Sequence, residues 1–210
     1  MTSWPSSSWL AAWAGAGARF TSMDAIDAIQ RRTSVRRYRP DPVSRETIGR
    51  LLDCAVRAPN HKLTEPWRFA VLTGEAKARL ADIRAGHRLR KAEDPGSEEA
   101  RARADKARRE TLESPAVIVL MARTSDDDIT REEDYAAVMM ATANLMTAAQ
   151  SLSLGTYLKT GGVMREAGLA QLVGLPEKYR IVGILSLGYP VEAESPRRRR
   201  PAGELTTWLE

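Results

Sequence analysis

Arginines and hydroxyl residues gather where the first expected helix ends, in the stretch RRTSVRRY. The group consists of Arg31, Arg32, Arg36 and Arg37, interleaved with Thr33 and Ser34. Several guanidinium groups beside hydroxyls suit a phosphate or another planar anion, because guanidinium donates paired hydrogen bonds to such oxygens. Cations at the C-terminal end of a helix also complement its dipole. Spacing alone leaves both interpretations open.

A second candidate is the loop RAPNHKLTEPWRF, which contains the helix-ending Pro59, then His61 and Lys62, and an anchoring Trp67. Such a loop can lay polar groups against a flat aromatic ligand while Trp67 packs into the core, but the same pattern also suits an ordinary loop. A zinc or iron site is disfavoured, because the chain has two histidines and one cysteine and so lacks the usual ligands.

Lys159 stands in GTYLKTGG, a segment bounded by glycines. A fixed cation near a flavin pyrimidine stabilises the negative charge of the reduced ring, and the alternative is an exposed surface lysine. The residue order does not match a P-loop, and no G-x-G-x-x-G occurs. The chain also lacks a nucleophile elbow and a plausible cysteine–histidine pair. If the protein is an enzyme, its chemistry therefore belongs to a bound cofactor.

The basic tail, Arg197 to Arg200, supplies four of the formal net charges of +5 and leaves +1 for the rest of the chain. A general nucleic-acid-binding surface is thus poorly supported, since it requires cations spread over a face or helix. A basic tail alone indicates a solvated end. However, Pro201 and the amphipathic GELTTWLE after it suggest a segment that docks.

Alternating helix and strand patterns position these candidates. Helices are expected from Met23, over 44–58, over 75–113 with a break near 94–96, and over 135–154; strands are expected over 67–73, 116–122 and 180–190. Ser44 and Thr47 resemble a capping box, and the apolar stripe of that helix is Ile48, Leu51, Leu52 and Val56. The order predicts an α+β sandwich.

Helix 135–154 is apolar nearly all round, which indicates complete burial and, in a chain of 210 residues, a second subunit on its far side. No apolar run reaches the roughly 20 residues of a membrane span. Cys54 cannot form an intrachain disulfide and is expected to be a small buried residue. We expect a cytoplasmic protein whose single domain covers 23–210, with 1–22 as a disordered extension.

Four motifs together resemble the FMN-dependent nitroreductase family, from about Met23 to the C-terminus. RRTSVRRY is similar to the R-x-S-x-R/K-x-[FY] signature, and RAPNHKLTEPWRF to the R-A-P-[SND]-x-x-x-x-Q-P-W-x-F loop. AAQSLSLGT is similar to the buried-helix exit, and GYPVEAESPRRRRP to the G-Y-P…K-x-R-x-P tail. The P-N-H-K form is most similar to the short NAD(P)H nitroreductase subgroup. Glu65 departs from the usual Gln before Pro-Trp.

The resemblance implies a three-layer sandwich with a central mixed or antiparallel sheet flanked by helices. It also implies an intertwined homodimer with FMN at the interface, on which the tail from about 190 docks. The implied FMN contacts are Arg31, Arg32, Thr33, Ser34, Arg36, Leu158, Lys159, Thr160, Arg197 and Arg199, with Arg57 and His61 reaching the flavin of the other subunit. An NAD(P) segment is implied at Ala148, Ala149, Gln150, Ser151, Leu152 and Ser153.

The implied function is hydride transfer from NAD(P)H through flavin N5 to an electron-poor nitro compound, quinone or enone, in a ping-pong cycle without a catalytic side chain. Two alternatives stay open: a flavin-dependent dehydrogenase or oxidase of a small molecule, and a non-catalytic flavin-binding module. The sequence does not choose between NADH and NADPH or name the acceptor.

Overall fold

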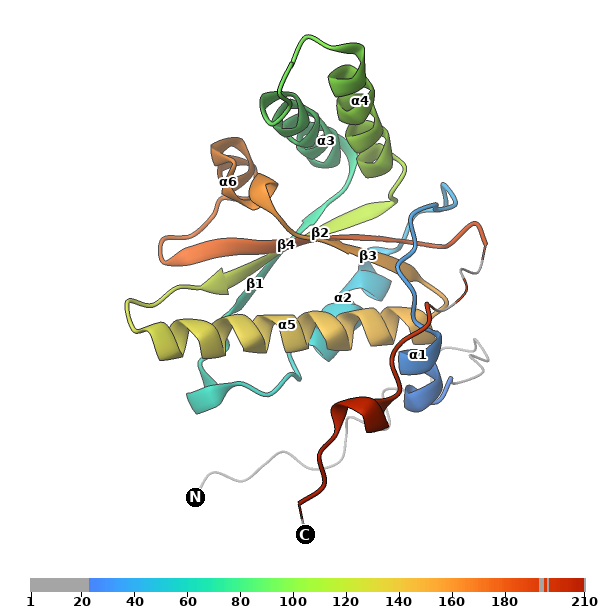
Figure 1. The fold of residues 1–210 in the computed structure, drawn as a ribbon, viewed down its shortest axis with the longest axis vertical. Coiled ribbons are helices and arrows are strands. Elements are labelled where there is room, and N and C mark those ends of the chain that lie inside the picture. Colours follow the sequence, from blue (N-terminus) through green and yellow to red (C-terminus); the bar gives the residue numbers. More distant parts are fainter. Residues whose placement is uncertain (1–22, 193–194, 196, 210) are drawn as a thin grey trace.

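The computed structural model of the chain describes residues 23–192, 195 and 197–209. The expected extension, residues 1–22, lies outside the described residues. Within the described part the chain forms an α+β fold, in which helices cover both faces of one sheet (Figure 1).

The sheet has four strands in the order β1-β2-β4-β3, and every neighbouring pair is antiparallel. The strands are β1 (Trp67–Leu72), β2 (Ala116–Arg123), β3 (Gly155–Lys159) and β4 (Tyr179–Gly188). Strands β2 and β4 lie in the centre and are buried almost throughout, as their continuous apolar runs predict. Strand β3 is therefore an edge strand, and no described strand pairs with its outer side.

Six α-helices and three short 3-10 turns surround the sheet in the described residues. The helices are α1 (Ala25–Arg31), α2 (Arg45–Ala55), α3 (Gly74–Arg90), α4 (Glu98–Leu112), α5 (Asp128–Ser151) and α6 (Ala167–Val173); the turns are η2 (His61–Leu63), η3 (Gly162–Arg165) and η4 (Ala202–Leu205). Helices α2 and α5 pack on one face of the sheet, and α3 and α6 pack on the other. Helix α4 pairs with α3 as a hairpin (Figure 1).

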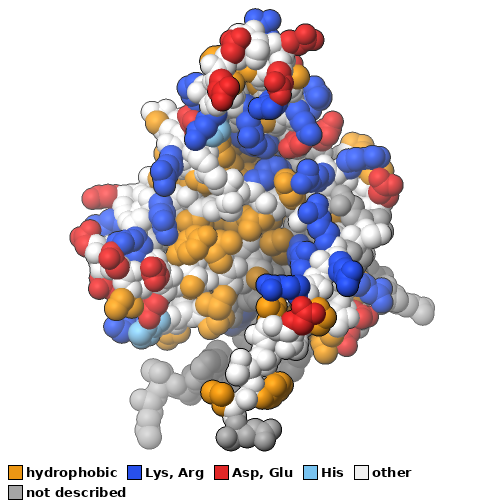
Figure 2. Space-filling model, in the orientation of Figure 1, with side chains coloured by type: hydrophobic (Ala, Val, Ile, Leu, Met, Phe, Trp, Pro, Cys, Tyr) orange, Lys and Arg blue, Asp and Glu red, His pale blue; other side chains and the backbone are white. Residues whose placement is uncertain are grey.

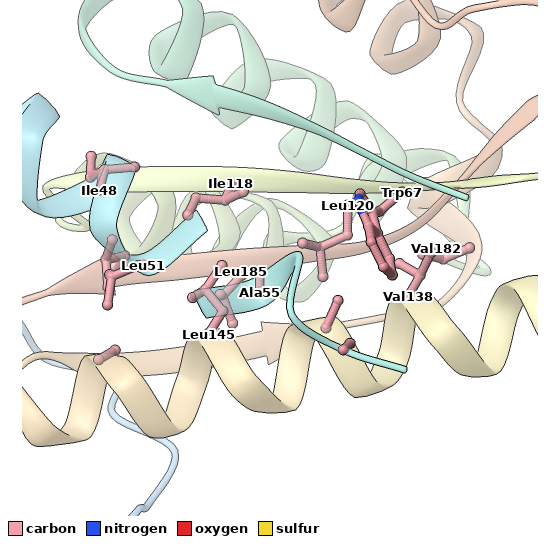
Figure 3. Close-up of a cluster of buried hydrophobic side chains, with 14 of the residues drawn as sticks. Ile48, Leu51, Ala55, Trp67, Ile118, Leu120, Val138, Leu145, Val182 and Leu185 are labelled. Carbon is pink, nitrogen blue, oxygen red and sulfur yellow. The ribbon is translucent and has the colours of Figure 1, made fainter. Parts of the chain in front are cut away.

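The larger core lies between the sheet and α5. Alternate residues of β2, Ile118 and Leu120, point to this face because side chains alternate across a strand. Figure 3 shows these side chains, together with Trp67 and Leu51, directed toward α5. The predicted anchoring role of Trp67 is thereby confirmed, since its side chain is 5% exposed.

Helix α2 begins as its sequence predicts. The Ser44 hydroxyl accepts a hydrogen bond from the Thr47 backbone N–H at 3.1 Å, which is the expected N-terminal cap. The helix buries Ile48, Leu51 and Ala55 against α5.

The prediction that Cys54 is buried was wrong, because its thiol-bearing side chain is exposed. The buried stripe of α2 runs through Leu51 and Ala55, so Cys54 lies at its border on the solvent side. Val56 also lies outside the buried stripe and is 39% exposed.

Helix α5 buries one side against the sheet, including Val138, Ala141 and Leu145. Its other side leaves Tyr135 and Met140 about two-fifths exposed. The all-round apolar pattern of the sequence is therefore satisfied only in part within one chain. No helix among the described residues combines the length and the apolar character needed to cross a membrane.

Candidate functional site

The first arginine-rich motif lies along the free edge of β3. Helix α1 ends at Arg31, Arg32 is its C-cap, and the chain then becomes extended. Ser34 forms an isolated parallel bridge with Thr156, and the Val35 backbone N–H donates to the Thr156 carbonyl at 2.9 Å. Two segments that are more than a hundred residues apart in sequence are thus joined side by side.

Gly155 permits this close approach. A β-carbon at position 155 would lie 2.6 Å from Val35 Cγ2, and another side-chain atom of Val35 would be 2.7 Å away. No real side chain tolerates such distances, so the first motif can lie against β3 only because residue 155 is glycine.

Alternation along the extended segment divides the motif into two sides. Thr33 and Val35 line a hollow of about 370 Å³, which Gln150 and Ser153 of the α5 exit also line. Arg31 contributes to the same hollow. The structure therefore brings part of the first motif together with part of the expected NAD(P) segment.

The other side of the motif meets the side chains of β3. The Arg36 guanidinium carbon lies 4.9 Å from the centre of the Tyr157 ring, and Lys159 Nζ lies 4.5 Å from the same centre. Two cations therefore flank one aromatic ring, an arrangement that its π electrons stabilise. Arg36 and Lys159, both expected at the site, are brought together by a tyrosine that the motifs did not indicate.

Lys159 is not an exposed surface lysine. Its ammonium group hydrogen-bonds Ser186 Oγ of β4 at 2.9 Å. Burial is the main cause that lowers the pKa of Lys159 to about 7; the charges of Arg84 and Arg36 lower it further, whereas Glu110 opposes them. At neutral pH this lysine can therefore either carry or release a proton, which a solvated lysine does not do.

Arg84 lies behind this cluster on α3 and is 7% exposed. Its guanidinium donates to the Ala107 carbonyl at 3.1 Å and to the Thr111 hydroxyl, and it lies 3.8 Å from Glu110. Arg84 is thus fixed to α4. No sequence motif indicated Arg84, because its burial arises only when α3 and α4 pack together.

Arg32 has an unsatisfied buried donor. Its Nη1 atom is inaccessible to solvent and has no hydrogen-bond partner in the part of the chain that the structure describes. A buried donor without a partner is costly, and an anionic group beside the first motif would satisfy it. The residues present therefore fit an anionic ligand such as a phosphate-bearing cofactor.

The free edge of β3 continues beyond the bridge at Thr156. Alternate residues of a strand direct their backbone N–H and C=O groups to the same edge, so Leu158 directs its groups to the edge that Val35 occupies at Thr156. No described strand pairs with this edge at Leu158. Thr160, next in the expected set after Lys159, is exposed where the strand ends.

One expected residue, His61, lies elsewhere in the single chain. It follows α2, and its Nδ1 lies 2.8 Å from the Glu133 carboxylate near the beginning of α5. Arg57 instead follows Cys54, whose carbonyl accepts a hydrogen bond from Asn144 in the second half of α5. Gln150 stands near the opposite end of α5. A helix rises about 1.5 Å per residue, so these two ends are roughly 25 Å apart. One chain therefore does not bring His61 to the first motif.

The tail arginines Arg197 and Arg199 are exposed. The tail continues through η4 to Trp208 and Leu209, whose side chains are 83% and 92% exposed. Among the described residues, neither tail arginine forms a hydrogen bond or an ion pair with the first motif, although the segment before η4 passes next to α1 in the view of Figure 1.

The expected NAD(P) segment, Ala148 to Ser153, includes the end of α5 and the turn after it. Ala149 is buried, and the Ser151 hydroxyl donates to the Ala148 carbonyl at 2.8 Å, so these residues serve the helix end. Gln150 and Ser153 line the hollow.

Figure 2 shows hydrophobic side chains gathered in the middle of the face of the molecule that Figure 1 presents, between α5 and the helices α3 and α6. Lys and Arg side chains lie along the borders of the hydrophobic area (Figure 2). An apolar area bordered by cations suits a ligand that has a flat apolar body and negative charge.

These features define an α+β protein with a cation-rich candidate ligand site at the edge of its sheet. A model of the nitroreductase family matches residues 29–189, and the chain therefore belongs to the nitroreductase family, a family of flavin oxidoreductases. The resemblance expected from the motifs is confirmed.

Similar proteins agree with this assignment. Two relatives named "Putative NAD(P)H nitroreductase" are YfhC of Bacillus subtilis, 29% identical over 83% of this chain and 89% of the relative, and YdjA of Escherichia coli K12, 28% identical over 80% and 89%. A solved nitroreductase-like family protein from Bacillus cereus is 32% identical, with a TM-score of 0.77 over 92% of this chain and all of the other.

Proposed function

We propose that the protein binds FMN along the free edge of β3 and transfers reducing equivalents from NAD(P)H to an electron-poor small molecule. The observation that carries the proposal is the open edge at Leu158, next to the paired cations Arg36 and Lys159. The unsatisfied guanidinium of Arg32, in the same first motif, supports it. When bound, FMN would supply the hydride chemistry that no side chain of the chain can perform.

The chain's own residues would bind and orient this cofactor. The backbone groups of Leu158 can pair with hydrogen-bonding atoms on the rim of a planar ring, as an additional strand would. Arg32 would hold the phosphate, because guanidinium suits phosphate oxygens. Lys159 would place a positive charge, or a proton, next to the ring where negative charge develops on reduction.

We further propose a homodimer in which α5 lies in the interface. Its exposed side carries Tyr135 and Met140, and α1 adds the exposed Ile26 and Ile29. Exposed apolar side chains on two helices that pack together are candidates for a contact site. An antiparallel two-fold pairing along α5 would bring His61 of one subunit to the first motif of the other, across the roughly 25 Å that separates the two ends of α5 within one chain, and Arg57 would approach from the same loop. The exposed tail, with Arg197 and Arg199, would reach across in the same way.

The test is an anaerobic titration of FMN-supplemented protein, monitored by the visible spectrum during addition of NADPH and then NADH. Rapid bleaching followed by recovery when a quinone or nitroarene is added supports the proposal. Bound flavin that neither nicotinamide reduces would overturn the reductase activity and favour a dehydrogenase or a binding module. Protein that binds no flavin would overturn the cofactor.

Arg32→Gln and Arg37→Gln make a matched pair of variants for the flavin site. Arg32 holds the unsatisfied buried donor, whereas Arg37 is exposed and lies 3.4 Å from the exposed Glu192. Because a charge-assisted contact to phosphate is lost only in the first variant, we expect FMN affinity to fall roughly 10- to 100-fold in Arg32→Gln and to change little in Arg37→Gln.

A further inference from the structure

A carboxylate on the loop after β3 is held by two basic side chains of α3. Glu166 Oε1 lies 2.6 Å from His87 Nδ1, and Glu166 Oε2 lies 2.6 Å from Arg90 Nη2. His87 and Arg90 stand three residues apart and therefore share one face of α3. Glu166 is 79 residues away from His87 in sequence, so this contact joins two distant parts of the chain.

The contact is partly shielded from water. The side chains of His87 and Glu166 are 13% and 22% exposed, whereas that of Arg90 is 61% exposed. The hydrogen bond with His87 is the main cause that lowers the pKa of Glu166; burial opposes it, and the hydrogen bond from Arg90 adds to it. The carboxylate is therefore ionised at neutral pH, and its hydrogen bonds are charge-assisted.

The chain between β3 and Glu166 has glycines where this contact requires them. Gly161 has a φ of 117°, which L side chains rarely adopt, so it lets the chain leave the strand. A β-carbon at Gly162 would lie 3.1 Å from His87 Cε1 and 3.3 Å from Nε2. The imidazole of His87 thus packs directly on the backbone of Gly162 as well as on the carboxylate of Glu166.

The segment Lys159–Gly162 is consequently fixed at both ends. At one end Lys159 pairs with Ile184 of β4 and hydrogen-bonds Ser186. At the other end Glu166 is bound to α3. Between these points Thr160, Gly161 and Gly162 are exposed and belong to no strand. Val163 and Met164 of η3 also pack against the apolar core on this face of the sheet, so the attachment through Glu166 acts together with that packing to hold the exposed backbone.

We propose that Glu166 is a positioning residue, which His87 and Arg90 hold so that the segment Lys159–Gly162 keeps the one conformation that the cofactor requires. The inference rests on the proposed function, because that segment continues the β3 edge where we place the flavin. Glu166 would act through the backbone and need not touch the cofactor. Helix α3, which carries His87 and contains none of the motifs that indicated the site, would thereby influence the proposed flavin site.

Hydrogen exchange of flavin-free protein tests the attachment independently of any cofactor. In Glu166→Gln the charge is removed at nearly constant size, and we expect backbone amides 160–166 to exchange roughly 10-fold faster than in the unmodified protein. Glu99→Gln is the matched control, since Glu99 forms an ion pair with Arg103 that is exposed on α4. Unchanged exchange at 160–166 in Glu166→Gln would overturn the proposal.

Flavin affinity then tests the link to the site. If the segment is mobile in the free protein, part of the binding free energy is used to order it. Glu166→Gln should therefore bind FMN roughly 5- to 30-fold more weakly, and the midpoint potential of the bound flavin should shift. Faster exchange with unchanged affinity and potential would overturn the positioning role. If the unmodified protein binds no flavin, the proposed function fails, while the exchange experiment still decides whether Glu166 holds the segment.

Two further variants keep the test decisive if Glu166→Gln does not fold. His87→Gln removes the ring that packs on Gly162, and it should reproduce the faster exchange. Arg90→Gln removes the more exposed partner, and its effect should be smaller. Equal exchange in His87→Gln and the unmodified protein would contradict the proposal as directly as the first variant.

Discussion

The two histidines of the chain each meet a glutamate from a distant element, but their surroundings differ. His87 lies at 2.6 Å from Glu166 in a partly buried contact with Arg90 as a second donor to the carboxylate. His61 lies at 2.8 Å from Glu133, and both side chains are largely exposed, at 55% and 40%. The first contact can hold a segment in place, whereas the second is weakened by water and salt.

The segment after β3, which contains Glu166, and the loop around His61 also differ in backbone strain. The segment after β3 places glycine at its positive φ, Gly161. The loop around His61 instead places Lys62, Leu63 and Glu65 at positive φ, where a side chain costs free energy. Leu63 is also 83% exposed. A strained loop that exposes an apolar side chain is typical of a functional contact, in keeping with the proposal that this loop meets a second subunit.

Asp134 gives the largest expected effect, because it is the buried attachment of the His61 loop. Its carboxylate accepts hydrogen bonds from Arg123 Nε at 2.9 Å and from the Thr64 hydroxyl at 2.8 Å, and its side chain is 3% exposed. Asp134→Ala leaves both donors without this partner, and we expect the free energy of unfolding to fall by about 3 kcal/mol.

Urea denaturation measures this loss. Asp82→Ala is the matched control, because Asp82 binds Arg108 at 2.7 Å but is 62% exposed, and it should change the free energy of unfolding by less than about 1 kcal/mol. Similar losses in the two variants would show that the loop does not depend on its buried carboxylate.

Gly155→Ala tests the contact between the first motif and the beginning of β3, the strand that leads into the segment held by Glu166. The added β-carbon would overlap Val35, so the segment must move or Val35 must leave its rotamer. We expect a loss of about 1 to 3 kcal/mol in the free energy of unfolding. Gly49→Ala is the control: nothing lies within 4 Å of a β-carbon there, and alanine in helix α2 should stabilise by about 0.5 to 1 kcal/mol. Equal effects at the two glycines would contradict the close packing.

Lys159 predicts a pH dependence of stability. Its pKa is lowered from 10.5 to about 7 in the folded chain, mainly by burial, so between these values the unfolded chain binds more protons than the folded one. Stability from this group therefore rises as the pH increases from about 7 to 10.5, by at most about 1.4 kcal/mol per pH unit. Urea denaturation at several pH values should show a smaller rise in Lys159→Met. The same rise in both proteins would assign the effect to other groups.

The elements of the fold were predictable because their signals are local. Strand β2 is a continuous apolar run bounded by Pro115 and an aspartate cluster, and the break between α3 and α4 follows from Pro95 and Gly96. The exposure of Cys54 was missed because the neighbouring apolar residues do not fix which side of the stripe it occupies.

The site was predictable only in part. Arg36 and Lys159 could be named from their motifs, but spacing does not reveal that Tyr157 lies between them. The contact of Glu166 with His87 depends on how α3 packs on the sheet, which no periodicity encodes. The positive φ of Leu63 has no sequence signal either, since leucine is rarely found in that conformation.

Glu133→Gln should have the smallest effect and decides how the His61 loop is used. Exposed ion pairs contribute little, so in dilute protein the free energy of unfolding should change by less than about 0.5 kcal/mol. In the proposed dimer, however, the loop with His61 lies against the other subunit, where water is excluded and the same pair is worth more. Sedimentation analysis at increasing protein concentration separates the two situations. A variant that is equally stable but dimerises more weakly would show that this pair works between subunits, unlike His87 and Glu166. If Glu133→Gln dimerises as tightly as the unmodified protein, the pair of His61 and Glu133 does not act between subunits. The positive φ angles of the loop would then need an explanation other than the dimer contact.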